Sequence, residues 1–166
     1  MIQLKQITGQ EKHGIAEEIK MALADDLKVV LADTFSFYLK AHNYHWNVEG
    51  ANFSDYHAFF NTLYDDAWAA VDAVAEHIRT LDVYVPGSYS RFKELSTIEE
   101  ELKIPNAMVM MSRLEADNKK VLNSLMTAHA SAEAGDKRGI VNFLEDRIDT
   151  HEKHGWMLRA IMKGKG

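Results

Sequence analysis

Histidine and carboxylate side chains recur along this 166-residue chain at helical spacings. His42 and His45 are three residues apart, His57 follows twelve residues after His45, and Asp72 and Glu76 are four residues apart. Taken alone, each pair also fits a helix cap or a solvated helix face. Together, imidazoles and a pair of carboxylates on one helix face suit iron or manganese. The pattern therefore favours a transition-metal site.

The spacing of these residues sets a limit on that site. His45 and His57 can converge across a tight antiparallel turn, whereas the 15 helical residues from His57 to Asp72 span about 22 Å. One metal ion does not bridge that distance within one chain. The two halves meet only if a second copy lies antiparallel about a two-fold axis, so that each copy's histidines face the other's Asp72 and Glu76. Such a dimer holds two identical sites.

The positioning elements are helices. Pro and Gly are sparse, and apolar residues recur at steps of three and four, which predicts four long helices. They are expected at about 15–47, 53–81, 105–133 and 137–162. The first break falls at Val48-Glu49-Gly50-Ala51. We expect Pro105 in the first turn of the third helix, Gly135 at its end, and Asp136 as the cap of the fourth.

Residues 83–105 form a long connection with a short helical turn expected at about 91–95. Two helices, a long crossover and two more helices are the layout of a ferritin-like bundle. We therefore expect an all-α, ferritin-like four-helix bundle with a short extra helix in the crossover between helices 2 and 3. It forms a single domain over residues 1–166, with short flexible termini at about 1–12 and 163–166.

A ferritin-type di-iron site inside one bundle takes a Glu-x-x-His motif from each of two helices. The chain contains neither Glu-x-x-His nor Asp-x-x-His. We therefore do not expect a conventional di-iron centre within one subunit, in agreement with the two-fold arrangement.

Composition excludes several classes of protein. Hydrophobic residues at 46% and charged residues at 27% exclude intrinsic disorder, and the sequence has no apolar run long enough to span a membrane. The absence of Cys excludes disulfides, thiolate chemistry and iron–sulfur clusters. Met1–Gln10 lacks the apolar core of a signal peptide, so we expect a cytoplasmic protein. A net charge of −6 argues against a broad basic surface for nucleic acid.

The sequence resembles the Dps family, the DNA-binding proteins from starved cells or mini-ferritins, over nearly its whole length. Residues 41–50 (AHNYHWNVEG) look like the family's first-helix signature. His57 and residues 71–76 (VDAVAE) follow at the family's distances, and residues 151–158 (HEKHGWML) are similar to its last helix.

This resemblance implies a hollow, twelve-membered shell of two-fold dimers that oxidises Fe(II), preferably with hydrogen peroxide, and stores ferric mineral inside. It assigns His45 and His57 as imidazole ligands, with Asp72 and Glu76 as carboxylate ligands from the two-fold mate. These four are the expected catalytic and metal-binding residues, and zinc or manganese are possible substitutes for iron. Acidic residues are expected to line three-fold pores for iron: Glu133, Asp136, Glu145 and Asp146.

One position departs from the family's pattern. The family commonly places an acidic residue four residues after its second histidine, and here that residue is Asn61. A neutral amide is a weaker iron ligand, so we expect each centre to hold one iron tightly and a second weakly. Asp65 and Asp66 lie a further turn along the helix and are not expected to replace it.

Three functions remain to be compared. The leading one is a ferroxidase and iron-storage shell that protects the cell from oxidative stress. The second is a DNA-binding and compacting shell protein with little ferroxidase activity. Family members that bind DNA well usually carry basic tails, and only Lys163 and Lys165 resemble one here, so we expect DNA binding to be weak or absent. The third is a bundle that binds zinc for structure only, without a redox step.

Overall fold

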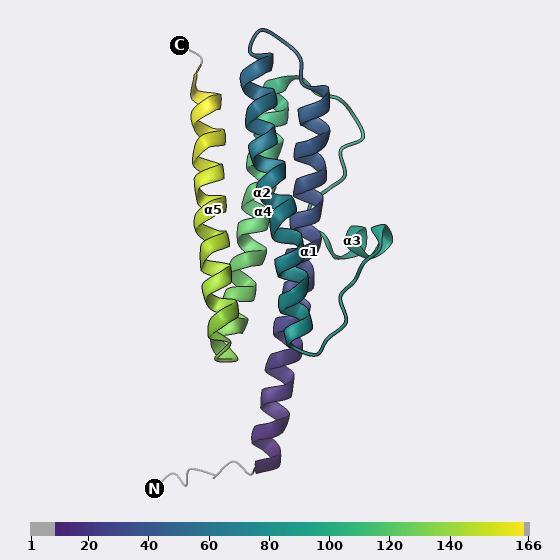
Figure 1. Ribbon diagram of the computed structural model, residues 1–166, viewed down its shortest axis with the longest axis vertical. Helices are drawn as coiled ribbons and strands as arrows, with labels where there is room; N and C mark the ends of the chain where they lie inside the picture. Colours follow the sequence, from purple (N-terminus) through teal and green to yellow (C-terminus); the bar gives the residue numbers. More distant parts are fainter. Residues whose placement is uncertain (1–8, 165–166) are drawn as a thin grey trace, which may run out of the picture.

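The computed structural model describes residues 9–164, which fold as a bundle of long helices (Figure 1). The long helices are α1 (Gly9–Asn47), α2 (Phe53–Thr80), α4 (Ala107–Ala134) and α5 (Arg138–Lys163), and the short helix α3 (Tyr89–Leu95) lies in the crossover. Helix α1 packs against α2, α3 and α4, and α4 packs against α5. The predicted ferritin-like four-helix bundle with one extra helix is confirmed. None of the helices between Gly9 and Gly164 has the length and apolarity needed to cross a membrane.

Each long helix buries one face in a common core. On α2 the buried residues recur at steps of three and four: Phe60, Leu63, Ala67, Ala70, Val74 and Ile78. Tyr64 and Val71 are half-buried at the edge of this face. Leu27 of α1, Met111 of α4 and Leu144 of α5 are fully buried in the same core. Each such side chain stabilises the fold by about 1.5–3 kcal/mol.

The turn between α1 and α2 falls where the sequence predicted it. Helix α1 ends at Asn47 and α2 begins at Phe53. Gly50 has a φ of 119°, a left-handed conformation that favours glycine because it has no Cβ. The turn is therefore short, and it brings the end of α1 beside the start of α2.

The start of α1 lies earlier than expected. The helix begins at Gly9, before the predicted Ile15 and inside the segment expected to be a flexible terminus. Residues 1–8 and 165–166, which belong to the expected flexible termini and include Lys165, lie outside the described residues.

The start of α4 also differs from the prediction. Pro105 lies before the helix and not in its first turn. The cap is Asn106, whose side-chain oxygen accepts a hydrogen bond from the backbone N–H of Val109 at 3.1 Å. An amide at this position satisfies a backbone donor that proline cannot.

The prediction that Asp136 caps α5 is wrong. Helix α5 begins at Arg138, with Lys137 at the cap position and no side-chain cap. Asp136 has a φ of 50°, whereas Gly135 has an ordinary φ of −87°. Asp136 is therefore the residue of the turn with a left-handed backbone conformation. Its carboxylate accepts a hydrogen bond from the side chain of Arg138 at 3.1 Å. Asp tolerates this conformation better than most residues. Asp136 therefore contributes its backbone conformation to the turn and does not act as a side-chain cap.

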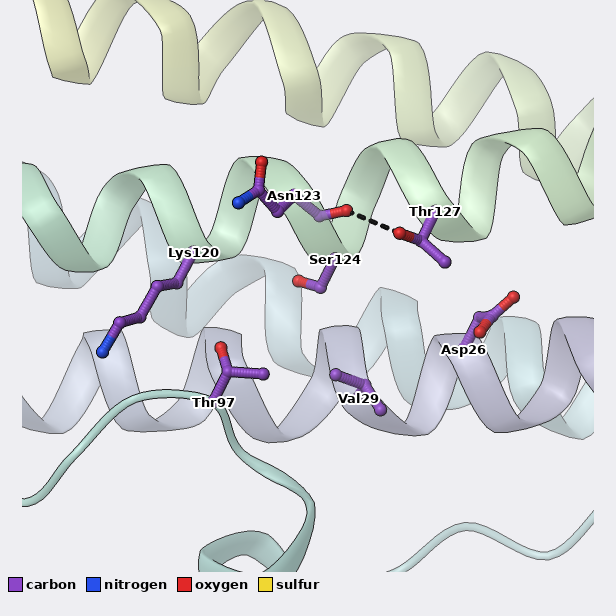
Figure 2. A pocket seen from close by; sticks show the side chains of 7 residues that line it. All are labelled: Asp26, Val29, Thr97, Lys120, Asn123, Ser124 and Thr127. Carbon is purple, nitrogen blue, oxygen red and sulfur yellow. Dashed lines mark hydrogen bonds between the residues drawn. The ribbon is translucent and has the colours of Figure 1, made fainter.

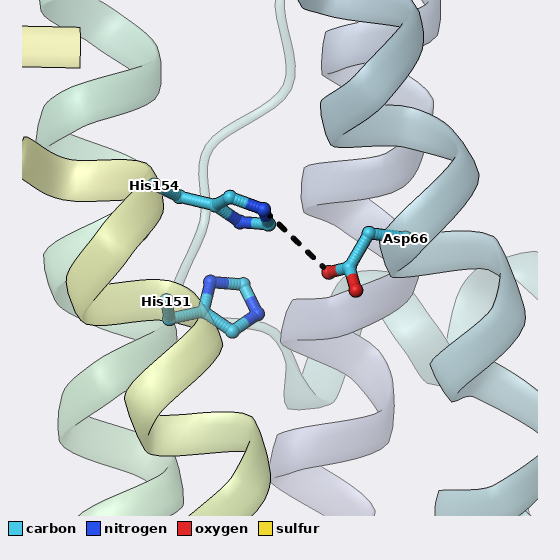
Figure 3. Close-up of side chains that lie close together, drawn as sticks. All are labelled: Asp66, His151 and His154. Carbon is cyan, nitrogen blue, oxygen red and sulfur yellow. Dashed lines mark ion pairs between the residues drawn. The ribbon is translucent and has the colours of Figure 1, made fainter. Parts of the chain in front are cut away.

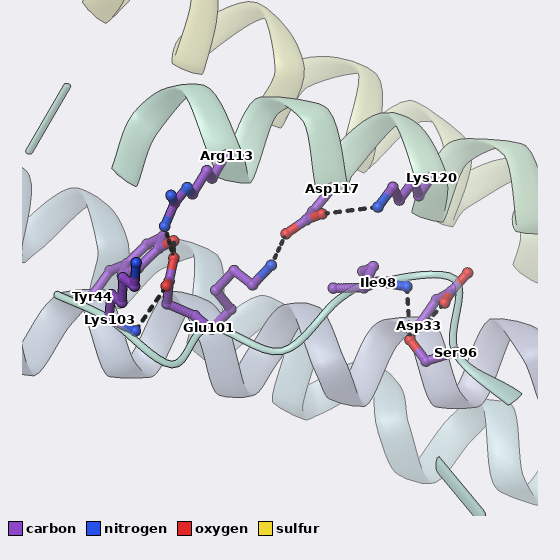
Figure 4. Close-up of polar contacts among 10 residues, drawn as sticks. Asp33, Tyr44, Ser96, Ile98, Glu101, Lys103, Arg113, Asp117 and Lys120 are labelled. Carbon is purple, nitrogen blue, oxygen red and sulfur yellow. Dashed lines mark hydrogen bonds and ion pairs between the residues drawn. The ribbon is translucent and has the colours of Figure 1, made fainter. Parts of the chain in front are cut away.

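Buried polar contacts fasten the crossover to the bundle (Figure 4). Asp33 of α1 is fully buried, and its carboxylate accepts hydrogen bonds from the hydroxyl and backbone N–H of Thr97 and from the hydroxyl of Ser96. A buried carboxylate is tolerated only when it is paired in this way. Asp33 therefore fixes the segment that follows α3.

A second anchor joins the crossover to α1 and α4. The Tyr44 hydroxyl donates to Glu101 at 2.7 Å, and Glu101 also pairs with Arg113. Burial opposes ionisation of Glu101, but hydrogen bonds from Tyr44, Arg113 and a backbone amide lower its pKa to about 2. The carboxylate is therefore charged and fully bonded at neutral pH. Nearby, a buried ion pair between Lys40 and Asp117 joins α1 to α4.

Replacing Asp33 by Ala is expected to lower the free energy of unfolding by about 3 kcal/mol, because three hydrogen bonds from Ser96 and Thr97 to a buried carboxylate are lost. Urea denaturation followed by circular dichroism measures the change. Asp25→Ala is the matched control, since Asp25 is exposed and pairs with Lys28 on the same helix, and it should cost less than about 1 kcal/mol. Equal losses for the two variants would contradict the anchoring role of Asp33.

Candidate functional site

His45 at the end of α1 and His57 in the first turns of α2 meet as the sequence predicted. Their ring centroids are 3.6 Å apart and their planes differ by 21°. Each Nδ1 atom lies 2.8 Å from the backbone carbonyl oxygen of the other histidine. A carbonyl oxygen only accepts, so both Nδ1 atoms carry a proton. An uncharged imidazole with its proton on Nδ1 keeps its lone pair on Nε2, which is the atom left to bind a metal.

His42 is packed among aromatic rings beside this pair. Its ring stacks on Tyr64, with centroids 4.0 Å apart and planes 18° apart, and lies 4.0 Å from the ring of Trp46. Burial and the neighbouring His45 lower the pKa of His42, which favours its uncharged form. Trp46 is nevertheless 60% exposed. The histidine pair thus lies beside an aromatic surface that its own chain leaves uncovered.

Asp72 and Glu76 lie far from this pair in the same chain. Both are exposed on α2, one helical turn apart. Asp72 is about 22 Å further along the helix than His57. One chain therefore brings the two predicted imidazole ligands together and leaves the two predicted carboxylate ligands facing solvent.

Asn61 is already engaged within α2. Its side-chain oxygen accepts from the hydroxyl of Tyr64 at 2.8 Å, and its amide nitrogen donates to the carboxylate of Asp65 at 2.5 Å. The amide oxygen, the only atom of Asn61 that could bind a metal, is therefore in use. Asp65 is exposed and directed toward Asn61.

Potential metal ligands also meet inside the bundle (Figure 3). This second cluster was not predicted from the sequence. Asp66 of α2 faces His151 and His154 of α5, and one ligand atom from each lies within 4.8 Å of the other two. Arg147 donates hydrogen bonds of 2.9 and 2.7 Å to the two carboxylate oxygens of Asp66. The His-x-x-His spacing of His151 and His154 was visible in the sequence. Their approach to Asp66 depends on the packing of two helices far apart in the chain.

Burial decides the charges of this internal cluster. It lowers the pKa of His151 to about 3, and it also lowers the pKa of His154, so both rings are neutral at physiological pH. Burial acts in the opposite direction on Asp66, but hydrogen bonds from Arg147 lower its pKa. The cluster therefore combines one carboxylate and one guanidinium with two uncharged imidazoles.

The remaining aromatic and sulfur side chains have packing roles or are exposed. Tyr44 is fully buried, and Trp156 is 61% exposed. Met110 and Met111 are buried in the core.

The acidic residues expected at the pores all lie on the surface: Glu133, Asp136, Glu145 and Asp146. Carboxylates of Glu133 and Glu145 lie 3.6 and 3.4 Å from the ring nitrogens of His129. Pores of this kind would form only between subunits, so their lining by these residues stays a prediction.

A cavity of about 340 Å³ lies between α1, α4 and the crossover (Figure 2). Its lining is mostly neutral: Asp26, Val29, Thr97, Lys120, Asn123, Ser124 and Thr127. The Asp26 carboxylate accepts from the hydroxyl of Ser131. This lining lacks imidazoles and does not form a metal-binding set.

Comparisons with known proteins place the chain in a family. The ferritin-like domain matches residues 24–164. The DNA protection during starvation protein of Brevibacillus brevis is 30% identical over 126 residues, which cover 76% of this chain and 85% of that protein. Among solved structures, a Dps protein from Bacillus brevis has a TM-score of 0.84 at 29% identity, covering 87% of this chain and 97% of that chain.

A Dps protein from Vibrio cholerae O1 gives the same TM-score of 0.84 at 28% identity, covering 88% of this chain and 92% of that chain. That protein is described as a member of a broad superfamily of ferritin-like diiron-carboxylate proteins. The chain therefore belongs to the ferritin-like family and, within it, to the Dps proteins.

Proposed function

We propose that this protein is a ferroxidase and iron-storage protein that oxidises Fe(II) at sites shared by two subunits and protects the cell against oxidative stress. The observation that carries the proposal is the reciprocal bonding of His45 and His57. It fixes both rings and leaves two Nε2 lone pairs side by side near the surface. Among residues 9–164 no carboxylate completes a metal-binding group with them. Neutral imidazoles in this arrangement accept Fe(II).

A second copy would supply the missing carboxylates. Asp72 and Glu76 are exposed, and Trp68, one turn before Asp72 on α2, is 56% exposed. Trp46 beside the histidines is likewise exposed, and large apolar side chains near polar ligands are typical of protein interfaces. An antiparallel pairing of the α1–α2 faces would cover both tryptophans. It would also bring each copy's carboxylates to the other's histidines.

The chemistry follows from these ligand types. The carboxylates of Asp72 and Glu76 favour Fe(III), whereas the imidazoles of His45 and His57 favour Fe(II), so iron remains bound as it is oxidised. Hydrogen peroxide takes one electron from each of two Fe(II) ions and, with two protons, becomes two water molecules. No hydroxyl radical is released in this balance. Zinc or manganese could occupy the same ligands, but zinc supplies no electron.

The assembly belongs to the same proposal. By likeness to the Dps proteins, two-fold dimers would form a twelve-membered shell in the cytoplasm, with ferric mineral stored inside. Iron and hydrogen peroxide would be its substrates.

Subunit mixing tests the shared site. Native protein loaded with Fe(II) without oxygen should oxidise it rapidly on adding hydrogen peroxide, as measured by ferric absorbance, and Asp72→Ala and His45→Ala should each lose this activity. Refolding the two variants together should restore about a quarter of the native rate, because half of the dimers are mixed and each mixed dimer has one intact site.

The matched control is a mixture of Asp72→Ala and Glu76→Ala. Both variants lack a carboxylate, so every site in the mixture is damaged and no rate should return. Recovery in this control, or none in the first mixture, would contradict a site shared between subunits.

Asn61 should make the two irons of each centre unequal. Anaerobic calorimetry with Fe(II) is expected to resolve one tight and one weak iron in the native protein. Asn61→Asp supplies a carboxylate and should strengthen the weak iron by about tenfold. Thr62→Asp, which adds the same charge at the neighbouring exposed position, should leave the affinity unchanged. Two equally tight irons in the native protein would refute the role given to Asn61.

DNA binding is the alternative function, and the name of the Brevibacillus brevis relative favours it. The chain carries a net charge of −6, so a shell of many copies would repel a phosphate backbone. We expect no mobility shift of linear DNA in low-magnesium buffer. Added Mg²⁺ can bridge the two surfaces and serves as the positive control. A clear shift without Mg²⁺ would show that charge does not govern this surface.

A further inference from the structure

The internal cluster of Asp66, His151 and His154 contains donor atoms already oriented for a cation. Asn118 fixes the first histidine: its amide nitrogen donates to the His151 carbonyl oxygen, so its side-chain oxygen must face the His151 Nδ1, 2.8 Å away. That Nδ1 therefore carries the proton, and the lone pair lies on Nε2. The Nε2 atom accepts from Arg147 at 3.2 Å.

His154 is the least satisfied member of the cluster. Its side chain is only 4% exposed, and its Nδ1 atom has no hydrogen-bond partner within the described residues. Its Nε2 atom is directed at Asp66 but lies 3.9 Å from the nearest carboxylate oxygen, too far for a hydrogen bond (Figure 3). A buried polar atom without a partner costs about 1–3 kcal/mol. Apolar packing would avoid that cost. Neither ring nitrogen of His154 makes a hydrogen bond among the described residues, so the Nε2 that faces Asp66 is available to a cation.

Arg147 holds the position that a metal ion would take. Its guanidinium contacts both oxygens of Asp66 and the Nε2 of His151. The carboxylate of Asp66 and the Nε2 of His151 are two of the three ligands that this cluster would present to a divalent transition ion, and His154 is the third. The Arg147 side chain is 12% exposed, and its long stem allows the charged end to move to solvent.

We propose that Asp66, His151 and His154 form a metal site inside each subunit for a divalent transition ion such as Fe²⁺ or Zn²⁺, which binds by displacing the guanidinium of Arg147. Metal bonds of about 2.1 Å place ligand atoms about 3.0–3.4 Å apart. The three ligand atoms lie within 4.8 Å of one another, so they must approach by about one ångström. Asn118 would keep the His151 ring oriented by the hydrogen bond on its far side.

This site is separate from the proposed oxidation centre. Asp66 lies nine residues beyond His57 on α2, about 13 Å along the helix, and all three ligands come from one chain. The site therefore does not depend on the dimer. A metal ion bound there would cross-link α2 to α5.

Cobalt binding tests the proposal in a full-length chain carrying His45→Ala and His57→Ala, which removes the imidazoles of the proposed oxidation centre. We expect one Co²⁺ per chain with visible absorption bands of nitrogen and oxygen ligands, together with a higher melting temperature. His154→Leu should weaken binding by at least about tenfold and abolish those bands. Arg147→Met should strengthen binding by about tenfold, because the competing cation is gone.

His154→Leu is the decisive variant, since it removes a ring with an unpartnered nitrogen and should preserve the fold, which circular dichroism verifies. His129→Leu, the loss of a partly exposed histidine on α4, is the matched control and should leave the bands unchanged. Absence of bound Co²⁺, or bands that persist in His154→Leu, would overturn the proposal whatever Arg147→Met shows. Because the oxidation centre is already removed, neither outcome bears on the proposed ferroxidase.

Discussion

The paired hydrogen bonds between His45 and His57 are the interaction on which the proposed oxidation centre depends. Each ring donates through Nδ1 to the other's carbonyl oxygen, so the two rings are oriented before any metal binds. The short turn around Gly50 sets the register of α1 and α2 that makes these bonds. The fixed rise of α2 then keeps Asp72 about 22 Å away. Under the proposed function, oxidation therefore requires a second subunit, and assembly becomes a condition of activity.

The two sets of potential ligands differ in environment. Asp72 and Glu76 are exposed, so they remain hydrated until a partner covers them. Asp66 is partly buried between the helices, and Arg147 balances its charge there. Histidine and carboxylate side chains would thus form two different metal sites. The oxidation centre would require assembly with a second subunit, and the internal site would require displacement of the Arg147 guanidinium.

Local sequence patterns predicted most of the fold and half of the proposed oxidation centre. Apolar residues at steps of three and four located the long helices, and a short turn was enough to bring His45 to His57. The caps were harder to predict, because Asp136 takes part in the turn through its backbone and not its side chain. Asp66 could not be assigned to His151 and His154, because no local spacing reports which faces of α2 and α5 meet.

Anomalous diffraction at the iron edge, from crystals of the assembled protein soaked anaerobically in Fe(II), tests the shared oxidation centre most directly. A peak is expected at the two-fold interface, bonded to His45 and His57 of one subunit and to Asp72 and Glu76 of the partner subunit. A fully iron-loaded crystal with no peak at that interface, or with His45 and His57 bonded to iron and no partner carboxylate in reach, would contradict it.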